Sequence, residues 1–195
     1  MRPIDRVEGT AIPLRGDNID TDRIIPARFL KAITFSGLGN HVFADDRRSM
    51  PGHPFADPVY SGANVLLVNE NFGSGSSREH APQALMRWGI GACVGQSFSE
   101  IFLANATTIG LPCLTAARAD IESLIRTVEE EPATPMVVSV HTLSLTTKGH
   151  TVGLRLPSAI RDAFLTGQWD ATGLLLQRFE NVHQVASRLP YLTGF

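Results

Sequence analysis

Three short apolar runs, separated by two helical patterns, are the feature that most restricts how this chain folds. The apolar runs are 63–69 (ANVLLVN), 90–96 (IGACVGQ) and 111–115 (LPCLT), and the helical patterns between them are 76–89 and 97–110. A short, continuously apolar run indicates a strand that is buried on both faces, as in a parallel sheet covered by helices. Strands that alternate with helices in this way predict consecutive β-α-β units and hence an α/β fold.

The flanking regions add further strands and helices to this centre. Weak alternation over 7–14 predicts an N-terminal strand, and a proline suits the first position of a short helix over 26–32. A helix over 118–131 is followed by expected strands at 135–141, 143–147 and 151–157, and the part over 157–195 is expected to be helical. The hairpin-like strands make the expected sheet mixed and only partly parallel. A length of 195 residues suits one layered domain over 1–195.

The segment from 36 to 62 differs from the rest of the chain. Glycine and proline recur in it, and its apolar residues show little periodicity. We therefore expect a long irregular loop. In a compact domain such a loop is usually functional or disordered.

Composition excludes several classes of protein. With 17 Lys and Arg against 19 Asp and Glu, the chain has no broad basic field that would attract nucleic acid or an anionic membrane. No signal-peptide core is visible, and no apolar run approaches the ~20 residues that span a membrane. Cys93 and Cys113 lie in apolar, strand-like segments, which fits a reducing cytoplasm. Two thiols are too few to hold an iron–sulfur cluster unaided.

The stretch 71-NFGSGSSREH-80 concentrates chemical groups where an expected strand meets an expected helix. In open α/β sheets ligands bind at the carboxyl ends of the strands, and the start of a helix favours an anion. Arg78 adds a guanidinium that can hold a carboxylate through two hydrogen bonds. A structural interpretation stays open, because Ser76 or Ser77 suits a helix N-cap and Glu79 suits a capping box.

Several familiar motifs are missing from the sequence. Neither a G-x-S-x-G nucleophile elbow nor a Walker A loop occurs around Gly73 and Gly75, and the third glycine of a dinucleotide fingerprint is absent. The remaining histidines are too scattered to indicate a metal site: His41, His53, His141, His150 and His183.

Two separated motifs give the chain a resemblance to a known family. The stretches 71-NFGSGSSREHAPQAL-85 and 16-GDNIDTDRIIPARFL-30 resemble two signatures of the swivelling domain of the aconitase superfamily. Their order and spacing are similar to those in the small subunits of 3-isopropylmalate dehydratases, and 170-DATGLLLQ-177 resembles the C-terminal stretch of that family. The resemblance covers nearly the whole chain and implies a layered β/β/α swivelling domain with a mixed sheet.

The resemblance also implies a division of labour between two subunits. A large iron–sulfur subunit would carry a 4Fe–4S cluster as a Lewis acid, and this chain would bind no metal or cofactor itself. The two would form a heterodimer or a larger complex. Carried over by position, Ser76 would be the general base, and Ser77 and Arg78 would grip a carboxylate of a small dicarboxylate substrate. A helix start, backbone N–H groups and an arginine would make a serine alkoxide accessible.

Other residues receive supporting roles from the resemblance. Arg47 stands where the family's loop over 36–62 carries an arginine for a second carboxylate, although the neighbouring Arg48 could take that part. Residues expected to shape or hold the substrate loop are Asp20, Thr21, Asp22, Gly75 and His80, the last with an equally weighted structural alternative. The expected location is cytoplasmic.

The resemblance implies the conversion of 2-isopropylmalate to 3-isopropylmalate by dehydration and rehydration, in leucine biosynthesis. Serine at 74 and aspartate at 46 depart from the family pattern, which more often has cysteine and an aromatic residue there. The departure at 46 leaves open the same chemistry on another diacid of the citraconate or methylmalate type. A non-catalytic anion-binding module is the alternative from another class of protein. A hydrolase that uses Ser76 as its nucleophile is disfavoured, because no pair of His and Asp or Glu is evident at triad spacing.

Overall fold

Two four-stranded sheets form the centre of the protein. The computed structural model describes residues 3–31, 34–75 and 78–192. One sheet is parallel, with strand order β2-β3-β4-β5, and consists of β2 (Ala11–Leu14), β3 (Val65–Val68), β4 (Ala92–Gly95) and β5 (Cys113–Thr115). The other is antiparallel, with order β1-β6-β7-β8, and consists of β1 (Arg6–Gly9), β6 (Met136–Ser139), β7 (Ser144–Thr147) and β8 (His150–Gly153). The predicted α/β class with a mixed, partly parallel arrangement of strands is confirmed.

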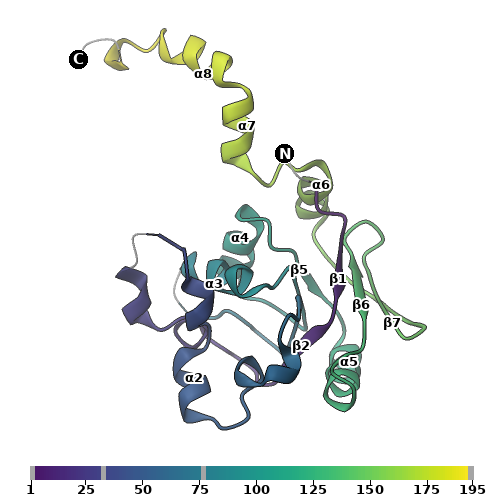
Figure 1. Cartoon of the computed structure of the whole chain (residues 1–195). Coiled ribbons are helices and arrows are strands. Elements are labelled where there is room, and N and C mark those ends of the chain that lie inside the picture. The colour runs from purple at the N-terminus through teal and green to yellow at the C-terminus, as the bar shows by residue number, and fades with distance from the viewer. Residues whose placement is uncertain (1–2, 32–33, 76–77, 193–195) are drawn as a thin grey trace.

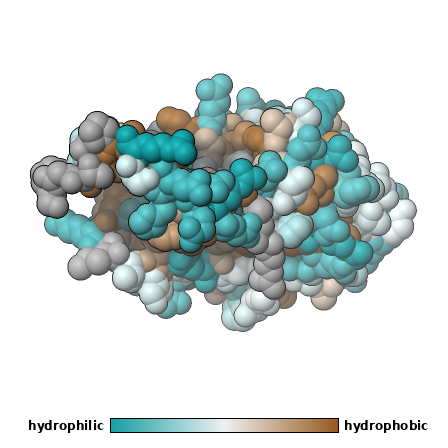
Figure 2. Space-filling model, turned by 90° about the horizontal axis from the view of Figure 1, so that it is seen from above, coloured by the Kyte–Doolittle hydropathy of each residue, from teal (hydrophilic) through white to brown (hydrophobic). Residues whose placement is uncertain are grey.

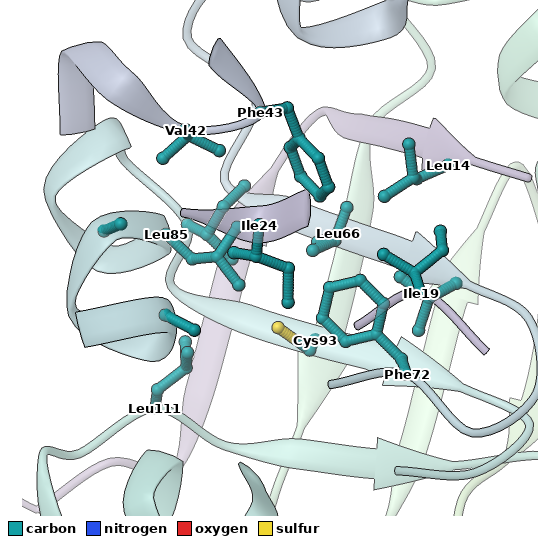
Figure 3. Packing of buried hydrophobic residues seen from close by; sticks show 14 of the residues in the cluster. Leu14, Ile19, Ile24, Val42, Phe43, Leu66, Phe72, Leu85, Cys93 and Leu111 are labelled. Carbon is teal, nitrogen blue, oxygen red and sulfur yellow. The ribbon is translucent and has the colours of Figure 1, made fainter. Parts of the chain in front are cut away.

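The parallel sheet separates two hydrophobic cores. On one face, side chains such as Leu66 and Cys93 pack beneath α1 (Thr21–Ile24), α3 (His80–Trp88) and α4 (Glu100–Thr108). Figure 3 shows Ile24 of α1 and Leu85 of α3 in this core. On the other face, Val65 and Val94 pack against α5 (Arg118–Glu130) and the antiparallel sheet. Because both faces are covered, every residue of β2, β3 and β4 is buried. The layers are those of the expected β/β/α domain (Figure 1).

The N-terminal strand predicted over 7–14 is in fact two strands in different sheets. β1 pairs antiparallel with β6, whereas β2 pairs parallel with β3. The chain passes between the sheets at Gly9, where a Cβ atom would lie 2.4 Å from Oδ1 of Asn64. Hydrophobic alternation reports which residues are buried and not which sheet they join, so the sequence pattern did not reveal this change.

The strand predicted over 151–157 ends earlier, as β8, and the chain then joins the two sheets a second time. Arg155 and Thr115 exchange two backbone hydrogen bonds, with N–O distances of 2.7 and 2.9 Å. This bridge holds the end of β5 against the segment that follows the antiparallel sheet. The two sheets are therefore connected at both the start and the end of the layered body.

The segment over 36–62, expected to be an irregular loop, contains four short helical elements. They are η2 (Leu38–His41), α2 (Ala44–Ser49), η3 (Pro54–Ala56) and η4 (Pro58–Tyr60), preceded by η1 (Ala27–Lys31), a 3₁₀ helix within the helix expected over 26–32. Phe43 is fully buried and Phe55 nearly so, with ring centroids 4.8 Å apart. Phe55 also packs 4.8 Å from the ring of Trp88 in α3. These aromatic contacts fix the segment to the helical face of the parallel sheet.

The C-terminal part is helical, as predicted, but only its first helix belongs to the body. α6 (Ser158–Thr166) buries Phe164 in the second core. α7 (Ala171–Gln177), α8 (Phe179–Ala186) and η5 (Pro190–Leu192) extend away from the body in Figure 1. None of the helices in the described ranges is long and apolar enough to cross a membrane.

Candidate active site at the ends of two parallel strands

The two motif loops leave the same edge of the parallel sheet and are joined through their backbones. One follows β2 and the other follows β3, which are paired neighbours. The N–H of Gly73 donates to the carbonyl of Ile19, and the N–H of Thr21 donates to the carbonyl of Ser74, both at 2.8 Å. Asp20 and Ser74 form an isolated parallel bridge. The stretch around Gly75 therefore lies at the carboxyl ends of the strands, where a ligand is expected.

The backbone of the serine loop favours glycine at both position 73 and position 75. Gly73 and Gly75 have φ angles of 77° and 97°, a region that side chains with a Cβ atom rarely adopt. A Cβ atom on Gly73 would also lie 2.3 Å from the ring of Phe102. At Gly75 it would lie 3.4 Å from Oγ1 of Thr21, which is van der Waals contact. The loop is thus pressed against both α4 and α1.

A pair of asparagines that the sequence reasoning missed supports the same junction. Asn18 and Asn71 have positive φ angles of 56° and 53°, and Nδ2 of Asn71 donates to Oδ1 of Asn18 at 2.8 Å. The backbone N–H of Asn18 also donates to the carbonyl of Glu70 at 2.9 Å. Asparagine is the residue, after glycine, that most readily adopts this left-handed conformation. The sequence did contain a signal for this pair, since an asparagine stands near the start of each of the two loops that follow β2 and β3.

We predict that Asn71→Gly and Asn71→Ala separate the two roles of this residue. Asn71→Gly keeps the left-handed backbone and loses one hydrogen bond, so it should lower the free energy of unfolding by about 0.5–1.5 kcal/mol. Asn71→Ala adds backbone strain and should cost roughly a further 1 kcal/mol. Urea titration of both variants checks the order. Equal losses would show that the conformation at 71 is not under strain.

Arg78 and Asp22 form the charged connection between the loops. Nη1 of Arg78 donates to Oδ1 of Asp22 in an ion pair, in which the Arg78 side chain is 22% exposed. Asp22 lies in α1, whose N-cap is Asp20, the acceptor of a 2.8 Å hydrogen bond from the N–H of Arg23. The D-T-D turn is thus a short capped helix that fixes one end of the Arg78 guanidinium.

The start of α3 corrects the predicted helix boundary. The helix was expected to begin at 76, with Ser76 or Ser77 as its N-cap, but it begins at His80, and Glu79 occupies the cap position without capping through its side chain. Glu79 instead accepts a 2.8 Å hydrogen bond from Nε2 of Gln83. Ser76 and Ser77 themselves lie outside the described residues. The capping-box interpretation of Glu79 is wrong, because the residue precedes the helix.

His80 contacts an aromatic residue from the preceding segment. Its ring lies edge-on to Phe35, with centroids 5.1 Å apart, and the guanidinium of Arg87 lies 5.2 Å from the same phenyl ring. Phe35 thus bridges the first and the last turn of α3. This contact places an aromatic side chain beside the first residue of the helix that follows the serine loop.

The two candidate arginines for a second carboxylate have different surroundings. Arg47 is partly buried and donates through Nη2 to the carbonyl of Asn40 at 2.6 Å. Arg48 is exposed and pairs with Asp45, which also receives two hydrogen bonds from Arg28. The Arg28 hydrogen bonds hold the pKa of the Asp45 carboxyl below its usual value. Of the two arginines, Arg47 is the better anchored and the less engaged with a carboxylate.

The aspartate that departs from the family pattern has a structural role. Oδ2 of Asp46 accepts a 2.9 Å hydrogen bond from Nε of Arg23, and Asp46 is buried. Asp22, which precedes Arg23 in α1, holds Arg78. Consecutive residues of α1 therefore connect the serine loop on one side and the helix that carries Arg47 on the other.

The described part of the chain offers no donor set for a metal or a cluster. Among the described residues no three His, Cys, Asp or Glu side chains come together as a metal site. Cys93 and Cys113 face each other across β4 and β5, and both are free and buried. Burial raises the pKa of the Cys113 thiol, which keeps it protonated. These two thiols do not fit an iron–sulfur cluster.

Comparison with known proteins agrees with this geometry. Residues 1–119 match the family model of the aconitase C-terminal domain. The chain is 47% identical to the 3-isopropylmalate dehydratase small subunit of Synechocystis sp., over 98% of this chain and 96% of that protein. The chain belongs to the 3-isopropylmalate dehydratase small-subunit family. Small subunits from Thermus thermophilus and Dechloromonas aromatica are 47% and 36% identical and cover 95% and 94% of the chain.

A solved structure agrees with the small-subunit fold. The crystal structure of a 3-isopropylmalate dehydratase from Methanocaldococcus jannaschii superposes with a TM-score of 0.65 and 24% identity. It covers 90% of this chain and 99% of its own. At this identity the similarity supports the swivelling-domain fold alone, and the assignment to the small-subunit family rests on the curated relatives.

Proposed function

We propose that this chain is the small subunit of a 3-isopropylmalate dehydratase, a hydro-lyase that needs a large subunit. The complex would convert 2-isopropylmalate to 3-isopropylmalate in leucine biosynthesis. The 47% identity to small subunits over nearly the full length supports the substrate. The observation that carries the role of the site is the Asp22–Arg78 ion pair, which joins the two motif loops beside the serine stretch.

Arg78 is proposed to bind a substrate carboxylate. Asp22 fixes the Nη1 end of its guanidinium, so the planar group is already oriented before the substrate binds. An oriented guanidinium loses less rotamer entropy on binding and presents its remaining N–H groups as a fork. The hydroxyl of Ser77, the preceding residue, is proposed to donate to the same carboxylate. Arg47 is proposed for the second carboxylate, because α1 connects its helix to the same site.

Ser76 is proposed to be the general base. It would remove the proton from a carbon beside a carboxylate while the hydroxyl leaves the adjacent carbon as water, which gives the unsaturated diacid. In the rehydration the hydroxyl would add to the first carbon and a proton would be returned to the adjacent one. A serine alkoxide needs nearby positive charge, and Arg78 lies two residues along the chain with its guanidinium held by Asp22. Gly75 and Thr21 would hold the turn that leads to the serine, since the N–H of Thr21 donates to the carbonyl of Ser74 at 2.8 Å and Gly75 follows with a φ angle of 97°.

The 4Fe–4S cluster is proposed to reside in the large subunit. In that position it would supply Lewis-acid chemistry to the complex. The buried thiols of Cys93 and Cys113 do not fit it, and the small-subunit names of the relatives imply a larger partner. The complex would consist of one or more copies of each subunit. A cytoplasmic location is proposed because both cysteines are free.

We predict that Arg78→Lys raises the KM for 2-isopropylmalate about 10- to 150-fold. Lysine keeps the charge and loses the oriented fork, and a hydrogen bond to a charged group is worth about 1.5–3 kcal/mol. Steady-state kinetics of the reconstituted complex would measure the change. Arg126→Lys, an exposed substitution on α5, is the matched control and should leave KM unchanged. An unchanged KM in Arg78→Lys would show that the guanidinium of Arg78 does not bind the substrate.

A further inference from the structure

Three aromatic side chains close the segment that contains α2, the helix of Arg47. Phe43 comes directly before this helix, and His53 and Phe55 follow it in the chain. The ring of His53 lies 5.2 Å from that of Phe43 and 6.0 Å from that of Phe55, and the two phenyl rings are 4.8 Å apart. α2 lies at the lower end of the body in Figure 1, opposite to the face of intermixed polar and apolar side chains that Figure 2 shows from above. Buried rings therefore hold together the two ends of a six-residue helix.

His53 also caps the turn that follows it, and this contact fixes where its ring carries a proton. Nδ1 of His53 accepts a 3.3 Å hydrogen bond from the N–H of Phe55, at the N-cap of η3. A ring nitrogen that accepts a hydrogen bond carries no proton, so in the neutral imidazole the proton is on Nε2. Nε2 is buried and has no hydrogen-bond partner among the described residues. The surroundings therefore fit a neutral imidazole and not an imidazolium with two N–H donors.

The charged groups around His53 come from four parts of the fold. They are Asp46 and Arg47 of α2, Arg23 of α1, Arg15 after β2 and Glu129 of α5, the last two lining a cavity of about 330 Å³ beside the ring. Three of these groups are positive and two are negative, so they do not attract an additional positive charge. Burial is the main cause that lowers the pKa of His53 below its usual value, and Arg23 and Arg47 act in the same direction. His53 is therefore neutral at neutral pH.

We propose that His53 is a positioning residue for Arg47 and that its protonation releases α2 as the pH falls, an inference that rests on the proposed function. A proton on Nδ1 would face the N–H of Phe55, so the cap of η3 would be lost. The imidazolium would also place a buried, unpartnered N–H beside two phenyl rings, which costs free energy. Movement of the ring would open the aromatic closure of α2. The second carboxylate of the substrate would then be bound less tightly, and KM would rise.

The test measures KM for 2-isopropylmalate as a function of pH in the reconstituted complex. With the unmodified chain, KM should rise by up to about tenfold for each pH unit below the pKa of His53. His53→Asn keeps an acceptor at the position of Nδ1 and has no group that gains a proton in this range, so its acid rise in KM should be lost. His150→Asn, at an exposed position of β8, is the matched control and should keep the unmodified profile. His53→Ala removes the acceptor and should raise KM at every pH.

An acid rise in KM that is the same for His53→Asn and the unmodified chain would overturn the proposal. The proposed function fails separately, because a complex that turns over no 2-isopropylmalate at any pH gives no KM to compare. Urea unfolding of the isolated chain then decides whether protonation releases the segment. The buried neutral ring binds fewer protons than the unfolded one, so stability should fall as the pH drops below 6.5, the ordinary pKa of histidine. His53→Asn should lose less stability over the same range, and equal losses would overturn the proposal.

Nitrogen NMR of the unmodified chain is the second measurement if His53→Asn does not fold. At neutral pH the spectrum should show the Nε2–H tautomer of His53, and its titration should be accompanied by shifts of the α2 amide signals. A proton on Nδ1 at neutral pH, or a titration that leaves the α2 signals unchanged, would overturn the proposal.

Discussion

Replacing Ser76 with alanine is expected to lower kcat of the reconstituted complex about 10²- to 10⁴-fold, the usual contribution of a positioned general base. KM should change little, because Ser77 and Arg78, and not Ser76, are proposed to bind the carboxylate of the substrate. Steady-state kinetics with 2-isopropylmalate at saturating small subunit would measure the effect.

Ser74→Ala is the control for the loss of a hydroxyl in the same loop. Oγ of Ser74 donates to the carbonyl of Asn18 at 3.3 Å, so this hydroxyl holds the junction of the two loops. Its removal should cost about 0.5–1.5 kcal/mol of stability with little change in kcat. A loss of less than about tenfold in kcat for Ser76→Ala, or an equal loss for both variants, would contradict the assignment of the base.

Phe43→Ala is expected to lower the free energy of unfolding by about 3–5 kcal/mol, the usual cost of removing a buried phenyl ring. Phe43 is fully buried, and its ring contacts Phe55 and lies 5.2 Å from that of His53. Its loss would leave a cavity between the segment over 36–62 and the parallel sheet. Because α2 follows directly, Arg47 should also become less well positioned, and KM should rise.

Urea unfolding of the isolated chain measures the stability effect. Val59→Ala lies in the same segment at a 54% exposed position and should change stability by less than about 0.5 kcal/mol. If Phe43→Ala cost less than about 1 kcal/mol, the segment would not be anchored as the structure shows. The glycine and proline content predicted an irregular loop over 36–62, whereas the buried ring of Phe43 anchors this segment to the core.

The centre of the fold was predictable because local pattern and burial agree there. The three apolar runs correspond to β3, β4 and β5, and the segments between them contain α3 and α4. A continuous apolar run is typical of a strand that is covered on both faces, so the sequence pattern also predicted layers on both sides of the sheet. The change of sheet at Gly9 has no such signal. It depends on which neighbouring strand is available, and that is a long-range property.

The candidate site was predictable from its motifs more than from local physics. The resemblance implied that the residues of the D-T-D turn support the serine loop, and the pairing of β2 with β3 brings the two loops together. The exact contacts needed the structure, because Asp22 reaches Arg78 across 56 residues of sequence and the Asn18–Asn71 pair depends on two left-handed turns. The later start of α3, at His80, likewise follows from this loop and not from helix propensity.

The central claim is tested most directly by anaerobic reconstitution with the large subunit from the same source, which is proposed to carry the iron–sulfur cluster. The absorbance of the unsaturated intermediate would be followed with 2-isopropylmalate and, side by side, with a citraconate-type substrate. The account predicts turnover of 2-isopropylmalate that depends on both subunits and collapses in Ser76→Ala. If a stable, cluster-loaded complex turned over only the other diacid, the proposed substrate would change to that diacid. One that turns over neither would contradict the account and favour an anion-binding module.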